Sequence, residues 1–161
     1  MKKFLDFLRN VLAVLAAILF GVIFVMNVAE IICRTFLGFS LLWVSDFVQL
    51  TVCWMLAFGM SAILYTRDHL RVDFIKQKLP EKVRSAVTVL TDGAELAFFV
   101  MLIPYGIRIA ETKMKISFTT LRWPTGYMYA ALPVFGALCS IFAAWLLYGS
   151  VRTLIKGRHK V

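Results

Sequence analysis

Four long apolar runs set the limits on what this chain can fold into. They cover about residues 11–33, 43–65, 86–107 and 126–150, and each is long enough to cross the hydrocarbon core of a bilayer as a helix. The sequence is 61% hydrophobic and 17% charged, more apolar than a soluble domain of 161 residues could bury. We therefore predict an all-α integral membrane protein, a single membrane domain over residues 1–161 with four transmembrane helices.

A polar segment, residues 65–85, separates the second run from the third and carries six of the 18 Lys and Arg residues. Its apolar residues recur every three or four positions, so they share one helical face, with most cations on the other. This pattern is typical of a helix that lies in the headgroup region. We expect an amphipathic interfacial helix over about residues 70–84, and a solvated loop is the alternative. The lipid-interface candidates are Arg71, Phe74, Ile75, Lys76, Lys78, Leu79 and Lys82.

The distribution of Lys and Arg predicts the orientation. Thirteen of these residues lie in the two ends and the central loop, and five lie in the other two connections. Cytoplasmic loops carry the excess of Lys and Arg, so both termini and the central loop are expected in the cytoplasm. The formal net charge of +9 could indicate nucleic acid, but the cations lie between or beyond the apolar runs. Membrane phospholipids are therefore the expected partner, and nucleic acid is not.

The Cys and His residues do not indicate catalysis or metal binding. The three Cys residues are widely separated in apolar runs, which suits small packing residues. The two His residues, His69 and His159, both lie in polar segments, so they cannot hold a haem between helices. We expect no cofactor and no enzyme activity.

Polar residues near the ends of the first two runs are candidates for contacts with protein. Glu30 and Arg34 are spaced four apart, in the order that favours an ion pair. The pair would either lower the cost of placing two charges at the membrane boundary or contact a partner subunit. Asp46 and Gln49 share one stripe of the second run, where a carboxylate facing lipid would be costly. That stripe is expected to face protein.

The third run contains two carboxylates, Asp92 and Glu95, on one face. Acids inside a membrane-spanning helix indicate function by default, so a proton or cation site is one hypothesis. The other, which we favour, is that they pair with cations of the central loop or with a partner helix.

Several short motifs, taken in order, resemble those of a known family. They are Arg34-x-Phe36, Ser40-Leu-Leu-Trp43-x-x-Asp46, the segment DHLRVD at 68–73, Leu79-Pro80-x-x-x-Arg84 and Tyr129-Ala-Ala-Leu-Pro133. Their order and spacing are similar to those of the small membrane subunit (DctQ-type) of tripartite ATP-independent periplasmic (TRAP) transporters. Two positions depart from the pattern. Ser45 and Asp46 stand where the family usually has two glutamates, and Asp68 stands where it has Gly.

The resemblance implies a non-catalytic subunit of a sodium-coupled importer of an organic acid, such as a C4-dicarboxylate or a sialic acid, in the bacterial inner membrane. It implies two protein partners, a large multi-helix membrane subunit and a periplasmic substrate-binding protein. The small subunit would brace the first and help dock the second. The alternative is a stand-alone homodimeric transporter that uses Asp92 and Glu95. The candidate partner-interface or structural residues are Arg34, Trp43, Asp46, Gln49, Asp92 and Glu95.

Overall fold

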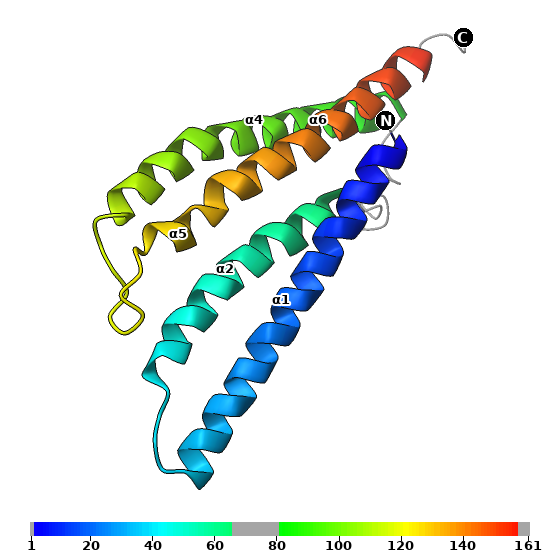
Figure 1. Ribbon diagram of the computed structural model, residues 1–161. Helices are drawn as coiled ribbons and strands as arrows, with labels where there is room; N and C mark the ends of the chain where they lie inside the picture. The colour runs from blue at the N-terminus through cyan, green and yellow to red at the C-terminus, as the bar shows by residue number, and fades with distance from the viewer. Residues whose placement is uncertain (1, 66–80, 158–161) are drawn as a thin grey trace.

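The computed structural model describes residues 2–65 and 81–157, which form five helices (Figure 1). These are α1 (Lys2–Phe36), α2 (Leu42–Tyr65), α4 (Glu81–Lys113), the short α5 (Gly126–Tyr129) and α6 (Ala131–Gly157). Four stretches are long and apolar enough to cross a membrane: Lys3–Phe36, Leu42–Tyr65, Val87–Lys113 and Gly126–Arg152. The prediction of an all-α membrane protein with four spanning helices is confirmed.

The expected interfacial helix lies almost wholly outside the described residues. Arg71, Phe74, Ile75, Lys76, Lys78 and Leu79 all fall between Tyr65 and Glu81. Lys82 is in the first turn of α4, where only the backbone is described. The interfacial helix therefore stays a prediction.

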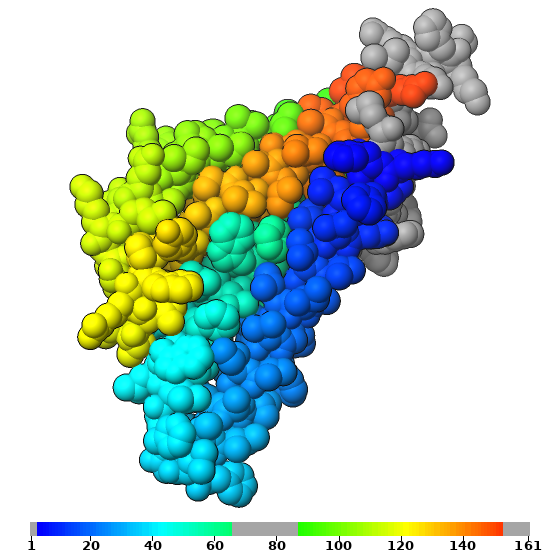
Figure 2. All heavy atoms as spheres, viewed as in Figure 1, coloured from blue at the N-terminus to red at the C-terminus, as the bar shows by residue number. Residues whose placement is uncertain are grey.

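The helices pack as two pairs. Helix α1 lies against α2 and α4 against α6, and the pairs meet mainly through α2 and α6. Figure 1 shows the pairs converging where α1 begins and α6 ends, which we call the terminal end, and in the space-filling view of Figure 2 the side chains of α1 and α6 lie side by side there. They diverge toward the end that holds the connections 37–41 and 114–125, which we call the loop end (Figure 1). The two pairs are thus joined by close packing at one end and need other contacts at the other.

A buried cluster lies where α2 crosses α6. Phe142 and Ser61 are both 0% exposed, and Cys139 is 1% exposed and forms no disulfide. The Ser61 hydroxyl donates a hydrogen bond to the Ala57 carbonyl (2.6 Å) and lies 3.4 Å from the Cys139 sulfur. The start of α1 also reaches this cluster, because Leu5 and Leu12 are among its members.

Close backbone approach holds α4 against α6. A Cβ atom on Gly106 would lie 2.9 Å from both the ring Cδ and the nitrogen of Pro133, too close for a side chain. A Cβ on Gly136 would lie 3.1 Å from the carbonyl oxygen of Phe99. Small residues at such positions let helices in lipid approach closely and gain van der Waals contact. Pro133 also lacks a backbone N–H, so one bond of the helical ladder is missing where α5 passes into α6, while Ala130 between them keeps a helical φ of −62° and ψ of −20°.

A hydrogen bond between side chains ties the first pair together at the terminal end. The Tyr65 hydroxyl, on the last residue of α2, donates to a carboxylate oxygen of Asp6 in α1 (2.7 Å). Helix α1 begins at Lys2, well before the apolar run at residue 11, because no Pro or Gly interrupts residues 2–10. That early start is what brings Asp6 level with the end of α2.

Candidate functional site

The main polar contact at the loop end is made by Asp46, one turn into α2. Its Oδ2 atom accepts hydrogen bonds from the backbone N–H groups of Thr120 (2.9 Å) and Leu121 (3.1 Å). It also accepts one from the Thr120 hydroxyl, which lies 3.2 Å from the Leu42 carbonyl oxygen. We call this set of bonds the Asp46–Thr120 link. The link fastens the connection between α4 and α5 onto the start of α2.

The connection 114–125 is folded so that its tip can meet Asp46. The backbone N–H of Phe118 donates to the Trp123 carbonyl, and that of Thr125 donates to the Ile116 carbonyl, both at 2.8 Å. Between them Arg122 has a φ of 55°, a left-handed conformation that reverses the chain. These two bonds close a narrow hairpin with Thr120 and Leu121 at its turn, where their N–H groups are free to point outward.

A second contact joins the helix pairs about halfway along α2. The indole N–H of Trp54 in α2 donates to the Tyr127 carbonyl in α5 (3.2 Å). Half-buried tryptophan indoles need such an acceptor, and the Tyr127 carbonyl supplies it. Together with the Asp46–Thr120 link, this bond holds α2 to the second pair where the helices diverge.

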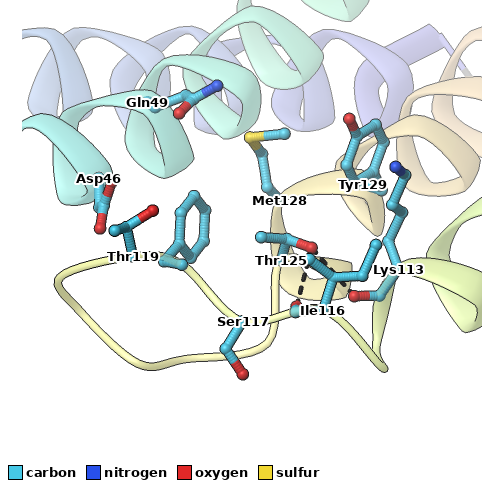
Figure 3. A pocket seen from close by; sticks show the side chains of 10 residues that line it. Asp46, Gln49, Lys113, Ile116, Ser117, Thr119, Thr125, Met128 and Tyr129 are labelled. Carbon is cyan, nitrogen blue, oxygen red and sulfur yellow. Dashed lines mark hydrogen bonds between the residues drawn. The ribbon is translucent and has the colours of Figure 1, made fainter.

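A polar hollow of about 310 Å³ lies beside the link (Figure 3). It is bounded by α2, the hairpin, the end of α4 and α5. The Lys113 ammonium lies over the Tyr129 ring, 5.7 Å from its centre. The ten lining residues are Asp46, Gln49, Lys113, Ile116, Ser117, Phe118, Thr119, Thr125, Met128 and Tyr129. The lining thus carries one carboxylate, one ammonium and several uncharged polar groups.

The two acids of the third run lie elsewhere, between α4 and α6. Asp92 is 6% exposed, and its Oδ2 accepts a hydrogen bond from the Ser150 hydroxyl of α6 (2.5 Å). Glu95 is half-buried one turn further along, and Thr88 is buried one turn before. Among the described residues no three His, Cys, Asp or Glu side chains come together in a way that could hold a metal ion. Asp92 therefore acts, in the structure, as a hydrogen-bond acceptor between two helices.

The six predicted candidates fall into two separate places. Arg34, Trp43, Asp46 and Gln49 lie at the loop end, whereas Asp92 and Glu95 lie between α4 and α6. Arg34 is exposed in the last turn of α1, and within residues 2–65 it makes no ion pair with Glu30. Trp43 is 40% exposed and packs its ring edge-on against Phe47, at 6.4 Å between centres. The expected Glu30–Arg34 pair is thus not formed in this structure.

Sequence reasoning did not identify the hydroxyl partners of the acids. Thr120 lies 74 residues beyond Asp46, and Ser150 lies 58 residues beyond Asp92. A carboxylate in an apolar helix signals that some donor must approach it. Nothing in the sequence selects these two hydroxyls from the others, because the choice depends on how the helices are packed.

Comparison with known proteins places the chain among transporter components. Residues 23–153 match the family described as tripartite ATP-independent periplasmic transporters, DctQ component. The chain is 23% identical over 136 residues to the sialic acid TRAP transporter small permease protein SiaQ of Vibrio cholerae serotype O1, which covers 84% of the chain and 79% of that protein. It is 24% identical over 132 residues to the sialic acid TRAP transporter permease protein SiaT of Haemophilus influenzae (strain 86-028NP). That match covers 77% of the chain but only 20% of the longer relative.

Proposed function

Because the chain belongs to the DctQ family of TRAP transporters, as a small membrane subunit, we propose that it braces a large permease subunit during import of an organic acid. The proposed partners are that large multi-helix subunit and a soluble periplasmic substrate-binding protein. Sialic acid is the first substrate to test, because the names of both relatives carry it. Coupling to sodium is assigned to the large subunit in this proposal. As a transporter component the chain is not an enzyme.

The main support for the bracing role is that carboxylates of the helices accept hydrogen bonds from other elements of the fold. Asp6, Asp46 and Asp92 each accept a hydrogen bond from a different part of the fold, and each bond joins two elements. Among the described residues no buried side-chain nitrogen or oxygen lacks a hydrogen-bond partner. Polar groups arranged in this way stiffen a bundle, whereas a substrate passage needs polar groups that remain available to the substrate.

The proposed location is the bacterial inner membrane, with both termini in the cytoplasm. In that orientation the loop end faces the periplasm, as the positive-inside rule favours. The hairpin and the Asp46–Thr120 link would then lie at the periplasmic surface, where a substrate-binding protein arrives. A hairpin fixed by several hydrogen bonds would offer such a protein a defined surface, because little conformational entropy of the hairpin would be lost on binding.

The test is co-purification. The full chain carries an affinity tag, is expressed with the large subunit encoded in the same host, and is extracted in mild detergent. We expect the large subunit to be recovered in equal amount, and uptake in liposomes to need both subunits and the substrate-binding protein. Recovery of the tagged chain alone, as a homodimer that transports by itself, would overturn the bracing role in favour of a stand-alone transporter.

A further inference from the structure

The connection between α1 and α2 exposes large apolar side chains. We call residues 36–43 the α1–α2 tip, which joins the two helices at the loop end (Figure 1). No residue from 35 to 45 carries a charge, whereas the hairpin at the same end carries Lys115 and Arg122. Contiguous exposed apolar surface indicates contact with a membrane or with another protein. The exposed apolar residues of the tip are Phe36 (81%), Leu37 (63%), Phe39 (51%), Leu42 (67%) and Trp43 (40%).

The tip continues two membrane-spanning stretches directly. One of them ends at Phe36, and the other begins at Leu42. In the turn of α1 before the tip, Ile31 and Ile32 are exposed as well. Exposed apolar side chains therefore run from the spanning part of α1 through the connection and into α2. Lipid that surrounds the helices is the nearest apolar material that could cover them.

The backbone of the tip limits how deep it can lie. Gly38 has a φ of 71°, a left-handed conformation that ends the helix. The backbone N–H groups of residues 38–41 make no hydrogen bond with any described residue. Irregular backbone with unpaired N–H groups is not tolerated against hydrocarbon, because no water is present there to accept from it. The backbone of the tip therefore needs the hydrated headgroup layer, whereas its side chains need the acyl chains just below.

The nearest cation fits the same level. Arg34 lies two residues before Phe36, is exposed, and makes no ion pair with a described residue. A long basic side chain beside an apolar surface can lay its stem on that surface and place its charge among the lipid phosphates. The nearest carboxylate on the other side of the tip, Asp46, is already bound by the hairpin. The charges that flank the tip thus favour a lipid surface as its partner.

We propose that the α1–α2 tip is a membrane anchor. Its backbone lies in the headgroup layer, and Phe36, Leu37 and Phe39 insert into the boundary with the acyl chains. The Trp43 ring suits the same boundary, because it is apolar and carries an N–H group. Ser40, the polar residue of the tip, stays within reach of water. The anchor holds the first helix pair in the leaflet at the end where the two pairs diverge.

The inference needs only the membrane-spanning fold. It does not depend on the orientation of the chain or on a role in transport, because both leaflets have a headgroup layer. Failure of the bracing role in co-purification would leave the anchor unaffected, and the reverse also holds. The other possible covers of the tip are a second copy of the chain and a partner subunit, and the experiment distinguishes both from lipid.

The experiment measures the depth of the tip with nitroxide labels in liposomes. The full chain, with its three native cysteines replaced, carries a single label at Leu37 or Phe39, or at Thr119 of the hairpin as the control. Collisions of the label with oxygen, which concentrates among acyl chains, are compared with collisions with a water-soluble nickel complex present on both sides. We expect oxygen to exceed nickel at Leu37 and Phe39, and nickel to exceed oxygen at Thr119.

Each of the other results overturns the anchor. Collisions that favour nickel at Leu37 and Phe39, as at Thr119, would place the tip in water. Low access of both reagents in the isolated chain would show that a second copy covers the tip. Low access of both reagents only after assembly with the large subunit would show that this subunit covers it.

Variants test whether the apolar side chains hold the tip in place. With the label at Leu42, Phe39→Asp should shift collisions from oxygen toward nickel, because a charge is costly among acyl chains and draws the tip toward water. The matched control is Ser40→Asp, which places the same charge on a neighbouring residue already in contact with water and should leave the collisions unchanged. Equal shifts in the two variants would contradict the anchor. Melting temperatures identify a misfolded variant, and Phe39→Ser, which adds no charge, should give a smaller shift in the same direction.

Discussion

Oδ2 of Asp46 lies 2.9 Å from the backbone nitrogen of Thr120, although the two residues are 74 positions apart in the sequence. Two backbone N–H groups and a hydroxyl converge on this one oxygen. A carboxylate held in this way fixes both the position and the orientation of the hairpin tip. The hairpin is therefore part of the helix bundle and not a free loop.

Replacing Asp46 should release the hairpin. Asp46→Ala removes the acceptor for all three bonds, so we expect a lower unfolding temperature and faster proteolysis at 119–122 in the detergent-purified chain. Thr119→Ala is the matched control, because the Thr119 side chain lies next to the link but makes no hydrogen bond with a described residue. Asp46→Asn should be intermediate, since its amide oxygen still accepts from N–H groups. Equal behaviour of Asp46→Ala and Thr119→Ala would contradict the role of the link.

Removing the Ser150 hydroxyl should destabilise the packing of α4 on α6. Ser150→Ala leaves a buried Asp92 oxygen without its donor, which costs about 1 to 3 kcal/mol of unfolding free energy. The control is Ser140→Ala in the same helix. The Ser140 hydroxyl donates to the carbonyl of Ala137, which also belongs to α6, so it joins no second helix. Reversible unfolding in mixed micelles measures both values. Similar small losses for the two variants would mean that the Asp92–Ser150 bond contributes little.

Sodium dependence distinguishes a structural role of the paired acids from ion coupling. If Asp92 and Glu95 serve packing and assembly, Asp92→Asn and Glu95→Gln should weaken recovery of the large subunit in co-purification. The sodium concentration that gives half-maximal uptake in liposomes should be unchanged, because in this role neither acid contacts the ion. Intact assembly with a shifted sodium or pH dependence would contradict the structural role and support a coupling site.

Two glycines of α4 should respond in opposite ways to alanine. Gly106→Ala places a Cβ 2.9 Å from the Pro133 ring, so α4 must move away from α6 and stability should fall. Gly93→Ala meets no atom within 4 Å, so it should be neutral or stabilising by up to about 1 kcal/mol from helix propensity. The same micelle unfolding assay compares them. A Gly106→Ala variant as stable as Gly93→Ala would show that α4 and α6 are not held by close approach.

The orientation can be tested by chemical labelling of single introduced cysteines in a background without Cys33, Cys53 and Cys139. Positions near Ser40 and Thr119 should react with an impermeant reagent added to intact cells, whereas positions near Lys78 should react only after the membrane is opened. This follows from the unequal distribution of Lys and Arg between the two sides. Labelling near Lys78 from outside the cell would reverse the orientation.

The spanning helices could be predicted from the sequence because each helix satisfies its own backbone hydrogen bonds and needs only apolar length. Hydropathy therefore located all four, and it placed Asp46 and Asp92 inside them. The prediction that Glu30 and Arg34 pair was wrong for this structure, since spacing makes an ion pair possible but Arg34 is exposed and gains little from it.

The partners across the bundle could not be predicted, because they depend on the tertiary arrangement. Gly106 and Gly93 look alike in the sequence, yet only Gly106 meets Pro133. The hairpin tip at Thr120 has no hydrophobic pattern of its own, and its shape is set by two backbone bonds and the left-handed Arg122. The site at the loop end is thus a product of packing.

The 74 residues between Asp46 and Thr120 also bear on how the protein is made. Synthesis runs from the N-terminus, so α2 reaches the membrane before the ribosome has produced the donors for its carboxylate. An acid near the middle of that helix would remain in the hydrocarbon without a partner. Asp46 lies one turn from the start of α2, where water can hydrate it until Thr120 emerges. Asp92 is placed similarly, near the start of its spanning stretch at Val87, and its donor Ser150 is synthesised later. Both acids are thus positioned so that each helix can insert before its partner exists.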